Sequence, residues 1–319
     1  MQGTVIKTGV RDYPRNLVEF DDQFQSEEAC ESYLMSLRWP DGFKCPWCRA
    51  DSAWRKARGV LRCAACRREI SITAGTIFQK THKPLRVWFR AMWWITSQKN
   101  GTSALGLQRN LGFGSYETAW TWLHKLRRTM VRPGRDRLKG CIEVDETYVG
   151  GIENNVHGRE TEDKCIVVIA AEEDGPGIGR IRVRRVLNVS AESLIPCVQE
   201  TVEPGSVVHS DGWCGYNGLE GKGYRHKVTN ITHSGQLAHE LMPRVHRVAA
   251  LLKRWLLGTH QNYASPKHLD YYLDEFTFRF NRRNSKHRGQ LFWRLMQQAV
   301  SIGPTTYDGM VQRSGPARR

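Results

Sequence analysis

The chain has 319 residues, enough for two or three domains that each bury a core of their own. It carries 48 Lys and Arg against 32 Asp and Glu, a net charge of +16 with an isoelectric point near 9.7, which favours a polyanionic partner such as nucleic acid. It has no run of 18 apolar residues, and its first residues lack the apolar stretch of a signal peptide. We therefore expect a cytoplasmic protein with no membrane partner.

Basic residues are concentrated in three segments of the chain. Residues 54–68 contain six Lys or Arg and no acid, residues 122–139 contain seven against one acid, and residues 253–288 contain eight against three acids. A solvated surface without a polyanionic partner is the alternative explanation, but it predicts a more even spread of charge. The clustering favours a nucleic-acid partner.

The first predicted element is an amphipathic helix over residues 27–37. Ser26 suits the N-cap position, and Glu27 and Glu28 place negative charge at the positive end of the helix dipole. We expect this helix to pack on the element that follows it and to have a structural role.

Two Cys-x-x-Cys pairs follow, Cys45 with Cys48 and Cys63 with Cys66, separated by 14 residues. Each pair presents two thiolates from one tight turn, and two such turns complete the tetrahedral shell of a structural Zn²⁺. A redox dithiol is the alternative, but two matched pairs joined by a short hairpin fit a zinc ribbon better. So small a module should need its metal to fold. The first domain, residues 1–75, thus holds the helix and the ribbon.

The other cysteines are scattered and are interpreted as small buried residues. They are Cys30, Cys141, Cys165, Cys197 and Cys214.

The periodicity becomes helical over residues 76–137. Residues 84–95 predict a helix whose aromatic side chains belong to a core. Residues 102–111, a glycine turn at 112–114 and residues 115–130 then have the outline of a helix-turn-helix, with Ser115 as the cap of its second helix. We interpret this region as DNA-binding. Its candidate contact residues are Lys125, Arg127 and Arg128.

An α/β domain is predicted for residues 138–300, after a break at 131–135. The pattern indicates a mixed sheet with helices on its faces. Its elements are strands at 141–149, 164–171 and 180–189, a helix at 191–203, a strand at 206–210, and further helices. From residue 301 the chain has no periodicity, and we expect a disordered tail to residue 319.

Two aspartates mark the candidate catalytic site of this domain. Asp145 lies within the first strand and Asp211 at the end of a later one, so both carboxylates could converge at one edge of the sheet and hold Mg²⁺ against a phosphodiester. In the first strand Glu143 and Asp145 share one face and Glu146 lies on the other, so only one of Asp145 and Glu146 can point at a given site.

A helix is predicted from Pro243 to just before Gly258. His246 and Lys253 are seven residues apart, which is nearly two turns, so they share a face and could look into a common cleft. A histidine in this position would, taken alone, be interpreted as a surface residue.

Three sequence strings resemble the zinc-ribbon group of bacterial insertion-sequence transposases. The first two are Val-Asp-Glu-Thr-Tyr-Val-Gly-Gly around Asp145 and His-Ser-Asp-Gly-Trp-Cys-Gly-Tyr around Asp211. The third runs from Leu-Leu-Lys-Arg-Trp at 251–255 to Phe-Arg-Phe-Asn-Arg-Arg at 278–283. The resemblance extends from about residue 15 to 300. It implies a DDE-type enzyme with an RNase H-like catalytic core.

The resemblance also implies how such an enzyme would act. Asp145 and Asp211 would hold two Mg²⁺ ions, and Lys253 would hold a terminal phosphate. Strands would be cut at the transposon ends and joined to target DNA, which implies an oligomeric, nucleoid-associated complex on double-stranded DNA. The ribbon and the helix-turn-helix would recognise the terminal repeats. Arg279, Arg282 and Arg283 would bind the DNA backbone without sequence preference. Arg254 is a further DNA-binding candidate.

The sequence departs from the family pattern at the third acidic position, which falls on His246. A neutral imidazole can coordinate a divalent ion, but Mg²⁺ prefers oxygen, so the resemblance implies weaker binding or a shift towards Mn²⁺. Two interpretations follow. Either His246 serves as a ligand or an orienting group in a working variant of the site, or the element is catalytically impaired. Glu240 is a further candidate, although it lies outside the aligned helix position. The rival functions are a silenced DNA-binding regulator and a structure-specific nuclease.

Overall fold

The computed structural model describes residues 13–132, 134–151, 161, 164–230, 237–260, 266–305 and 310. They form two compact units, the first within Met1–Arg132 and Ser285–Gln312 and the second within Pro133–Asn284. No helix in the described part of the chain is both long and apolar enough to cross a bilayer.

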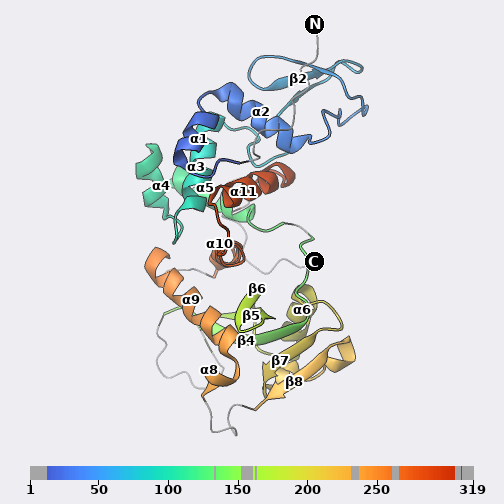
Figure 1. Cartoon of the computed structure of the whole chain (residues 1–319), viewed down its shortest axis with the longest axis vertical. Helices are drawn as coiled ribbons and strands as arrows, with labels where there is room; N and C mark the ends of the chain where they lie inside the picture. The colour runs from blue at the N-terminus through green and yellow to red at the C-terminus, as the bar shows by residue number, and fades with distance from the viewer. Residues whose placement is uncertain are drawn as a thin grey trace. The chain divides into compact units, whose positions relative to one another are not determined.

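The first unit contains a three-stranded antiparallel sheet and a group of helices (Figure 1). Ser26 caps α2 as predicted, because its hydroxyl accepts a hydrogen bond from the Ala29 amide at 3.2 Å. Ser115 caps α5 in the same way through the Thr118 amide at 3.1 Å. The elements are α1 (Leu17–Gln23), α2 (Glu27–Arg38), β1 (Ala53–Arg55), β2 (Val60–Cys63), β3 (Glu69–Ser71), α3 (Leu85–Ser97), α4 (Ala104–Leu111), α5 (Tyr116–Arg128) and α11 (Gly289–Ser301).

An aromatic cluster forms the core of the helical part of this unit. Phe292 of α11 is fully buried, and its ring lies 5.5 to 6.4 Å from those of Phe20, Phe24, Tyr33, Phe89 and Trp93. Trp88 stacks on Trp122 with centroids 3.5 Å apart. The aromatic residues of α3 therefore belong to a core, as predicted. Since α11 packs on α2 and α3, it belongs to the first unit, whereas we assigned it to the domain 138–300.

The second unit is built on a five-stranded mixed sheet in the order β6-β5-β4-β7-β8. β5 is antiparallel to both β4 and β6, and β7 is parallel to both β4 and β8. This confirms the predicted α/β class, a mixed sheet flanked by helices. The elements are β4 (Cys141–Val149), β5 (Cys165–Asp174), β6 (Gly177–Val186), α6 (Ala191–Thr201), β7 (Val207–Asp211), the short 3₁₀ helices η1 (Cys214–Tyr216) and η2 (Glu220–Lys222), β8 (Arg225–Thr229), α8 (Ala238–Leu241), α9 (Pro243–His260) and α10 (Leu269–Phe280).

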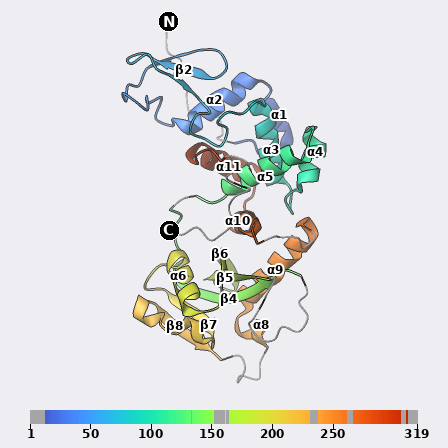
Figure 2. The ribbon, with the colours of Figure 1, turned by 180° about the vertical axis from the view of Figure 1, so that it is seen from behind.

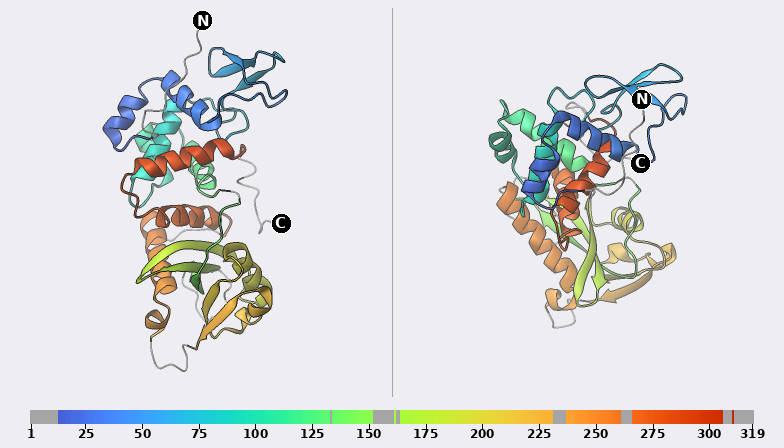
Figure 3. Two further views of the ribbon diagram at one scale, coloured as in Figure 1. Left: turned by 45° about the vertical axis from the view of Figure 1, so that its right-hand side comes forward. Right: turned by 45° about the horizontal axis from the view of Figure 1, so that its top comes forward.

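Helices cover both faces of this sheet. On one face α9 contacts β4 and β5 while α10 contacts β6, and Val167 and Ile169 pack there against Leu252 of α9. On the other face α6 lies against β5 and β6, with Val144 and Val168 among its neighbours in the core. Figures 1 and 2 show this unit from opposite sides, and Figure 3 shows the curvature of its yellow-green strands.

The element boundaries differ from the prediction in a few places. The predicted helix stop at Gly258 is wrong, because α9 continues to His260 and Gly258 lies within its last turn. The predicted tail begins at residue 301, which still belongs to α11, and most of the tail lies outside the described residues.

Candidate active site and zinc ribbon

Asp145 and Asp211 lie on neighbouring parallel strands. The pairing of β4 with β7 places Glu143 opposite His209, and continuing that register by two residues brings Asp145 level with Asp211. Adjacent strands are about 4.8 Å apart, and residues two positions apart on a strand share a face. The two carboxylates therefore belong to one face of the sheet, with Asp145 in the middle of β4 and Asp211 at the end of β7.

The structure shows which acidic residue of β4 faces this site. Asp145 points to the face covered by α9, where its Oδ2 lies 3.8 Å from Nε2 of His246. Its Oδ1 accepts a hydrogen bond from the Glu146 amide at 2.9 Å, which fixes the orientation of the carboxylate. Glu146 points to the opposite face and accepts a hydrogen bond from the buried Tyr216 hydroxyl at 2.9 Å.

His246 lies in the first turn of α9, and its side chain is 30 % exposed. Burial lowers the pKa of His246, while the negative charges of Glu143 and Asp211 act against this shift. The imidazole is therefore mostly neutral at pH 7, the form that can coordinate a metal ion. Lys253 and Arg254 lie further along α9 and are exposed, so both are accessible to a phosphate.

The environment of His246 fits a divalent ion. Its Nε2 is buried and has no hydrogen-bond partner in the described part of the chain, a costly state that an ion would relieve. The donor set of two carboxylates and an imidazole suits Mn²⁺ better than Mg²⁺. Among the described residues, however, only the zinc-ribbon cysteines form a group of three or more ligands within 4.8 Å of one another. The three side chains must therefore move closer together to share an ion.

The four cysteines of the ribbon form a ready zinc site. Sγ of Cys45 lies 3.6 Å from that of Cys66, and Sγ of Cys48 lies 3.5 Å from that of Cys63. Tetrahedral zinc with Zn–S bonds of about 2.3 Å requires sulfur atoms roughly 3.8 Å apart. The described geometry is therefore close to that of a zinc-bound ribbon.

The backbone of the two cysteine turns prepares them for a cation. Burial opposes ionisation of Cys45, but the amides of Cys48 and Trp47 outweigh it and lower the pKa of Cys45 to about 6. The Arg68 amide favours ionisation of Cys66, but the neighbouring cysteine sulfurs raise its pKa to about 11. Without a cation the four thiols cannot all ionise, since their charges repel one another.

The ribbon also exposes two tryptophans beside arginines. Trp54 is 49 % exposed with the Arg67 guanidinium 4.6 Å from its ring centroid, and Trp47 is 48 % exposed with Arg68 at 5.7 Å. Exposed aromatic rings paired with guanidinium groups suit contact with nucleic acid. The charge of this segment is visible in the sequence, but the role of the two tryptophans is not. An apolar residue in a short strand can be buried or exposed, and the sequence pattern does not distinguish the two.

The predicted DNA contacts of α5 are only partly accessible. Arg127 is 2 % exposed, so it cannot reach a phosphate in this arrangement, and that assignment is wrong. Lys125 is half-buried, and burial lowers its pKa. Arg128 is also half-buried. Tyr116 in the first turn is 54 % exposed, so the N-terminal end of α5 is the more open one.

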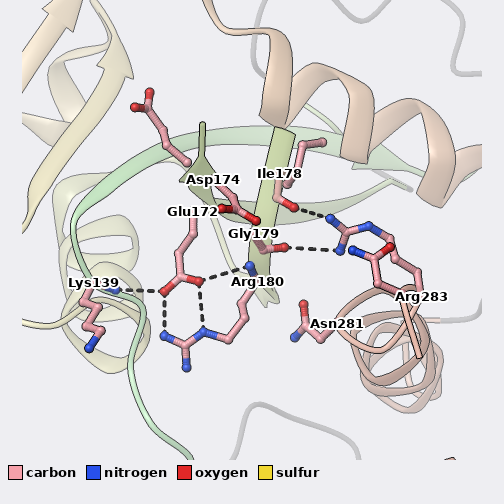
Figure 4. A pocket seen from close by; sticks show the side chains of 10 residues that line it. Lys139, Glu172, Asp174, Ile178, Gly179, Arg180, Asn281 and Arg283 are labelled. Atoms are coloured by element: carbon pink, nitrogen blue, oxygen red, sulfur yellow. Dashed lines mark hydrogen bonds and ion pairs between the residues drawn. The ribbon is translucent and has the colours of Figure 1, made fainter. Parts of the chain in front are cut away.

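The Phe-Asn-Arg-Arg segment has a structural role that the sequence did not predict. The side-chain amide of Asn281 accepts a hydrogen bond from the backbone N–H of Ile181 at 2.7 Å and donates one to the Ile181 carbonyl at 3.1 Å, which satisfies both of these backbone groups on the edge strand β6. Arg283 donates to the carbonyls of Ile178 and Gly179, as Figure 4 shows. The segment thus fastens the end of α10 to the edge of the sheet.

The other arginines near this segment are also engaged inside the protein. Arg279 pairs with the fully buried Glu275 at 2.8 Å, and Arg282 donates to the Phe278 carbonyl at 3.2 Å. These contacts give a structural role to side chains that we assigned to DNA.

Two known domain families match the chain. Residues 137–281 match the ISXO2-like transposase domain, and residues 25–69 match the transposase zinc-ribbon domain of the same IS1595 group. The chain belongs to the IS1595 insertion-sequence transposases. The first match contains Asp145, Asp211 and His246, and the second contains all four ribbon cysteines.

A curated relative agrees with this family. An uncharacterized protein in transposable element ISH50 of Halobacterium salinarum is 27 % identical over 217 residues, which is 62 % of this chain and 71 % of the relative. Among solved structures, the Mos1 strand transfer complex and a pre-cleavage Mos1 transpososome are similar at TM-scores of 0.29 and 0.26, with 11 % and 13 % identity. Both likenesses cover 70 % of this chain, and 78 % and 79 % of the Mos1 chains. TM-scores this low add nothing to the assignment.

Two residues beside the site were not identified from the sequence as functional. Glu143 is a buried carboxylate on the face of β4 that packs against α9, and Arg244 follows the proline that opens α9. A charged residue on the core side of a strand is the signal that could have marked Glu143, since such a charge needs a partner.

Proposed function

We propose that this transposase binds the ends of its insertion sequence and catalyses metal-dependent strand cleavage and strand transfer. Family membership supports the reaction class. One observation of the structure supports the site: Asp145 and Asp211 each lie two residues past the paired Glu143 and His209 on adjacent parallel strands, and Nε2 of His246, which has no hydrogen-bond partner among the described residues, is 3.8 Å from Asp145.

Each side chain has a distinct part in this proposal. Asp145, Asp211 and His246 would hold divalent ions, of which Mn²⁺ suits the imidazole best. Such ions, when bound, activate water and stabilise the leaving oxygen of an in-line displacement. Lys253, exposed and seven residues after His246 on α9, would hold the phosphate of the cut end. Arg254 would add charge beside it.

DNA ends would be recognised by the first unit. The exposed arginines and tryptophans of the ribbon offer phosphate contacts and stacking, and α5 presents its open N-terminal turn. Joining two ends to a target requires more than one active site or end-binding surface, so an oligomer on DNA is part of the proposal. A DNA-bound protein of this kind would be cytoplasmic and nucleoid-associated.

A cleavage assay tests the proposal. Purified protein is mixed with duplex DNA that carries an element end, in Mn²⁺ or Mg²⁺, and both nicked and joined products are measured. We expect both products from the wild type and neither from Asp145→Asn or Asp211→Asn, with end binding retained by both variants. Binding without any nicking would identify a silenced regulator, and nicking without joining would identify a nuclease.

A further inference from the structure

Glu143 is a buried charge two residues before Asp145 on β4. Its side chain is 1 % exposed, so its carboxylate is removed from water. A buried charge is costly unless it is paired and hydrogen-bonded. The partners of Glu143 therefore indicate what this residue does.

In the part of the chain that the structure describes, the hydrogen-bond partners of Glu143 lie at the start of α9. Oε1 pairs with Nη1 of Arg244 at 2.8 Å. Oε2 accepts hydrogen bonds from the amides of Arg244 at 2.8 Å and Val245 at 3.0 Å. These amides belong to the first turn of the helix, where no intrahelical acceptor exists. Glu143 thus supplies from a neighbouring strand the acceptor that a capping side chain usually provides.

Arg244 extends this connection to the β5–β6 hairpin. Its Nη2 donates to the Gly175 carbonyl at 2.8 Å and its Nε to the Gly177 carbonyl at 3.1 Å. Its Nη1 also contacts Glu173 at 3.1 Å. The first turn of α9 is therefore held at several points around the edge of the sheet.

These contacts exclude Glu143 as a replacement for the missing third carboxylate. Both of its oxygens already accept hydrogen bonds, and releasing them would leave the helix amides of Arg244 and Val245 without this acceptor. The next residue along α9 after Val245 is His246. The anchored turn is thus the turn that presents the imidazole to Asp145.

We propose that Glu143 and Arg244 are positioning residues that hold His246 against Asp145 for metal binding. The inference rests on the proposed function, since it assigns the pair to the same metal site. Glu143 precedes Asp145 by two positions on β4, and Arg244 precedes His246 by two positions on α9. A shift of either element would separate the two ligands.

A second buried pair in the same sheet provides a matched control. Glu172 on β5 is 11 % exposed at its side chain and accepts hydrogen bonds from Arg180 and from the Lys139 amide (Figure 4). Glu172 has the same chemistry as Glu143, but its partners lie away from α9. Glu172→Gln therefore reproduces the loss of a buried carboxylate without disturbing His246.

The test measures Mn²⁺ binding by the full chain, from the electron paramagnetic resonance signal of free Mn²⁺, together with amide hydrogen exchange in α9. We expect Glu143→Gln to weaken Mn²⁺ binding about 10–100-fold, as loss of supporting contacts typically does, and to speed exchange at the first turn of α9. Glu172→Gln should change neither. Arg244→Gln, whose side chain is 17 % exposed, should reproduce the effect if Glu143→Gln folds poorly.

The outcomes separate the two proposals. Unchanged Mn²⁺ affinity in Glu143→Gln and Arg244→Gln, an equal loss in Glu172→Gln, or no Mn²⁺ binding by the wild type would each overturn the positioning role. The wild type could bind Mn²⁺ in a way that depends on Asp145 and Glu143 and yet cut no DNA end. That result would support the positioning role and refute the proposed function.

Discussion

At the scale of single residues, strand β4 separates three carboxylates by their surroundings. Glu143 is enclosed by donors from α9, Asp145 faces His246, and Glu146 points through the sheet to Tyr216. Alternation along the strand makes this separation possible, because neighbouring residues point to opposite faces. On β4, Asp145 is therefore the carboxylate available to bind a metal ion, together with Asp211 on the neighbouring strand β7.

His246 offers a test of metal preference at this scale. His246→Glu restores an oxygen ligand, so we expect cleavage in Mg²⁺ to rise relative to cleavage in Mn²⁺. His246→Ala removes the ligand and should lower cleavage at least ~10-fold in both metals. Rates of end cleavage across a titration of each metal provide the measurement. Equal activity of the wild type and His246→Ala would show that the imidazole is not a ligand.

At the scale of elements, two small features hold separate parts of the chain together. The zinc ribbon is short of apolar core and relies on four sulfur ligands, whereas α10 depends on Asn281 and Arg283 to close the edge of β6. The unpaired backbone groups of an edge strand can pair with another chain and cause aggregation. The side-chain amide of Asn281 removes part of this risk, because it binds both the backbone N–H and the carbonyl of Ile181.

The ribbon should lose its fold with its metal. We expect about one Zn²⁺ per chain, and Cys48→Ser should lose that zinc and end binding together, because the closed shell needs all four thiolates. Zinc content by atomic emission and end binding by gel shift measure the effect. Cys214→Ser is the control, since Cys214 is exposed and lies outside the cluster. Retained zinc in Cys48→Ser would contradict the assignment.

Loss of Asn281 should destabilise the second unit. Asn281→Ala leaves two backbone groups of the buried Ile181 without this partner, at a cost of about 1–3 kcal/mol in the free energy of unfolding. Urea unfolding followed by circular dichroism measures the change. Arg254→Ala, at an exposed position of α9, should stay within about 0.5 kcal/mol of the wild type. If Asn281 instead acts on DNA, its substitution would weaken binding without changing stability.

At the scale of the whole molecule, the chain returns to its first unit after completing the second. Residues before Arg132 and after Ser285 share one core, with Phe292 of α11 at the centre of the aromatic cluster. In the sequence, the second unit is thus inserted between two parts of the unit that carries the ribbon. Stability of the first unit therefore depends on residues at both ends of the sequence.

Phe292→Ala tests this organisation. Removing the ring should lower the stability of the first unit by about 3–5 kcal/mol through loss of burial and creation of a cavity. End binding should fall with it, whereas Mn²⁺ binding by the second unit should remain. Gel shift and Mn²⁺ titration measure the two effects, and Leu257→Ala, at a residue that is 63 % exposed, is the control. Loss of Mn²⁺ binding in Phe292→Ala would contradict the division into units.

The sequence by itself determined the local features of this protein. Caps, apolar periodicity and paired cysteines specify helices, strands and a zinc ribbon through contacts between near neighbours, so Ser26, Ser115 and the four ribbon cysteines were assigned correctly. The strands of the second unit and the position of Asp145 on the face opposite Glu146 followed from the same short-range rules. The family resemblance came from strings that are likewise local.

Only the tertiary structure decided what distant residues do for one another. Glu143 meets Arg244 across 101 residues and Asn281 meets Ile181 across 100, and no local period encodes such a pairing. For the same reason the sequence could not show that Arg127 is enclosed, or that the exposed Arg283 donates to backbone carbonyls. Charge can be counted from sequence, but its accessibility and its partners depend on how the chain packs, because burial is a property of the assembled core.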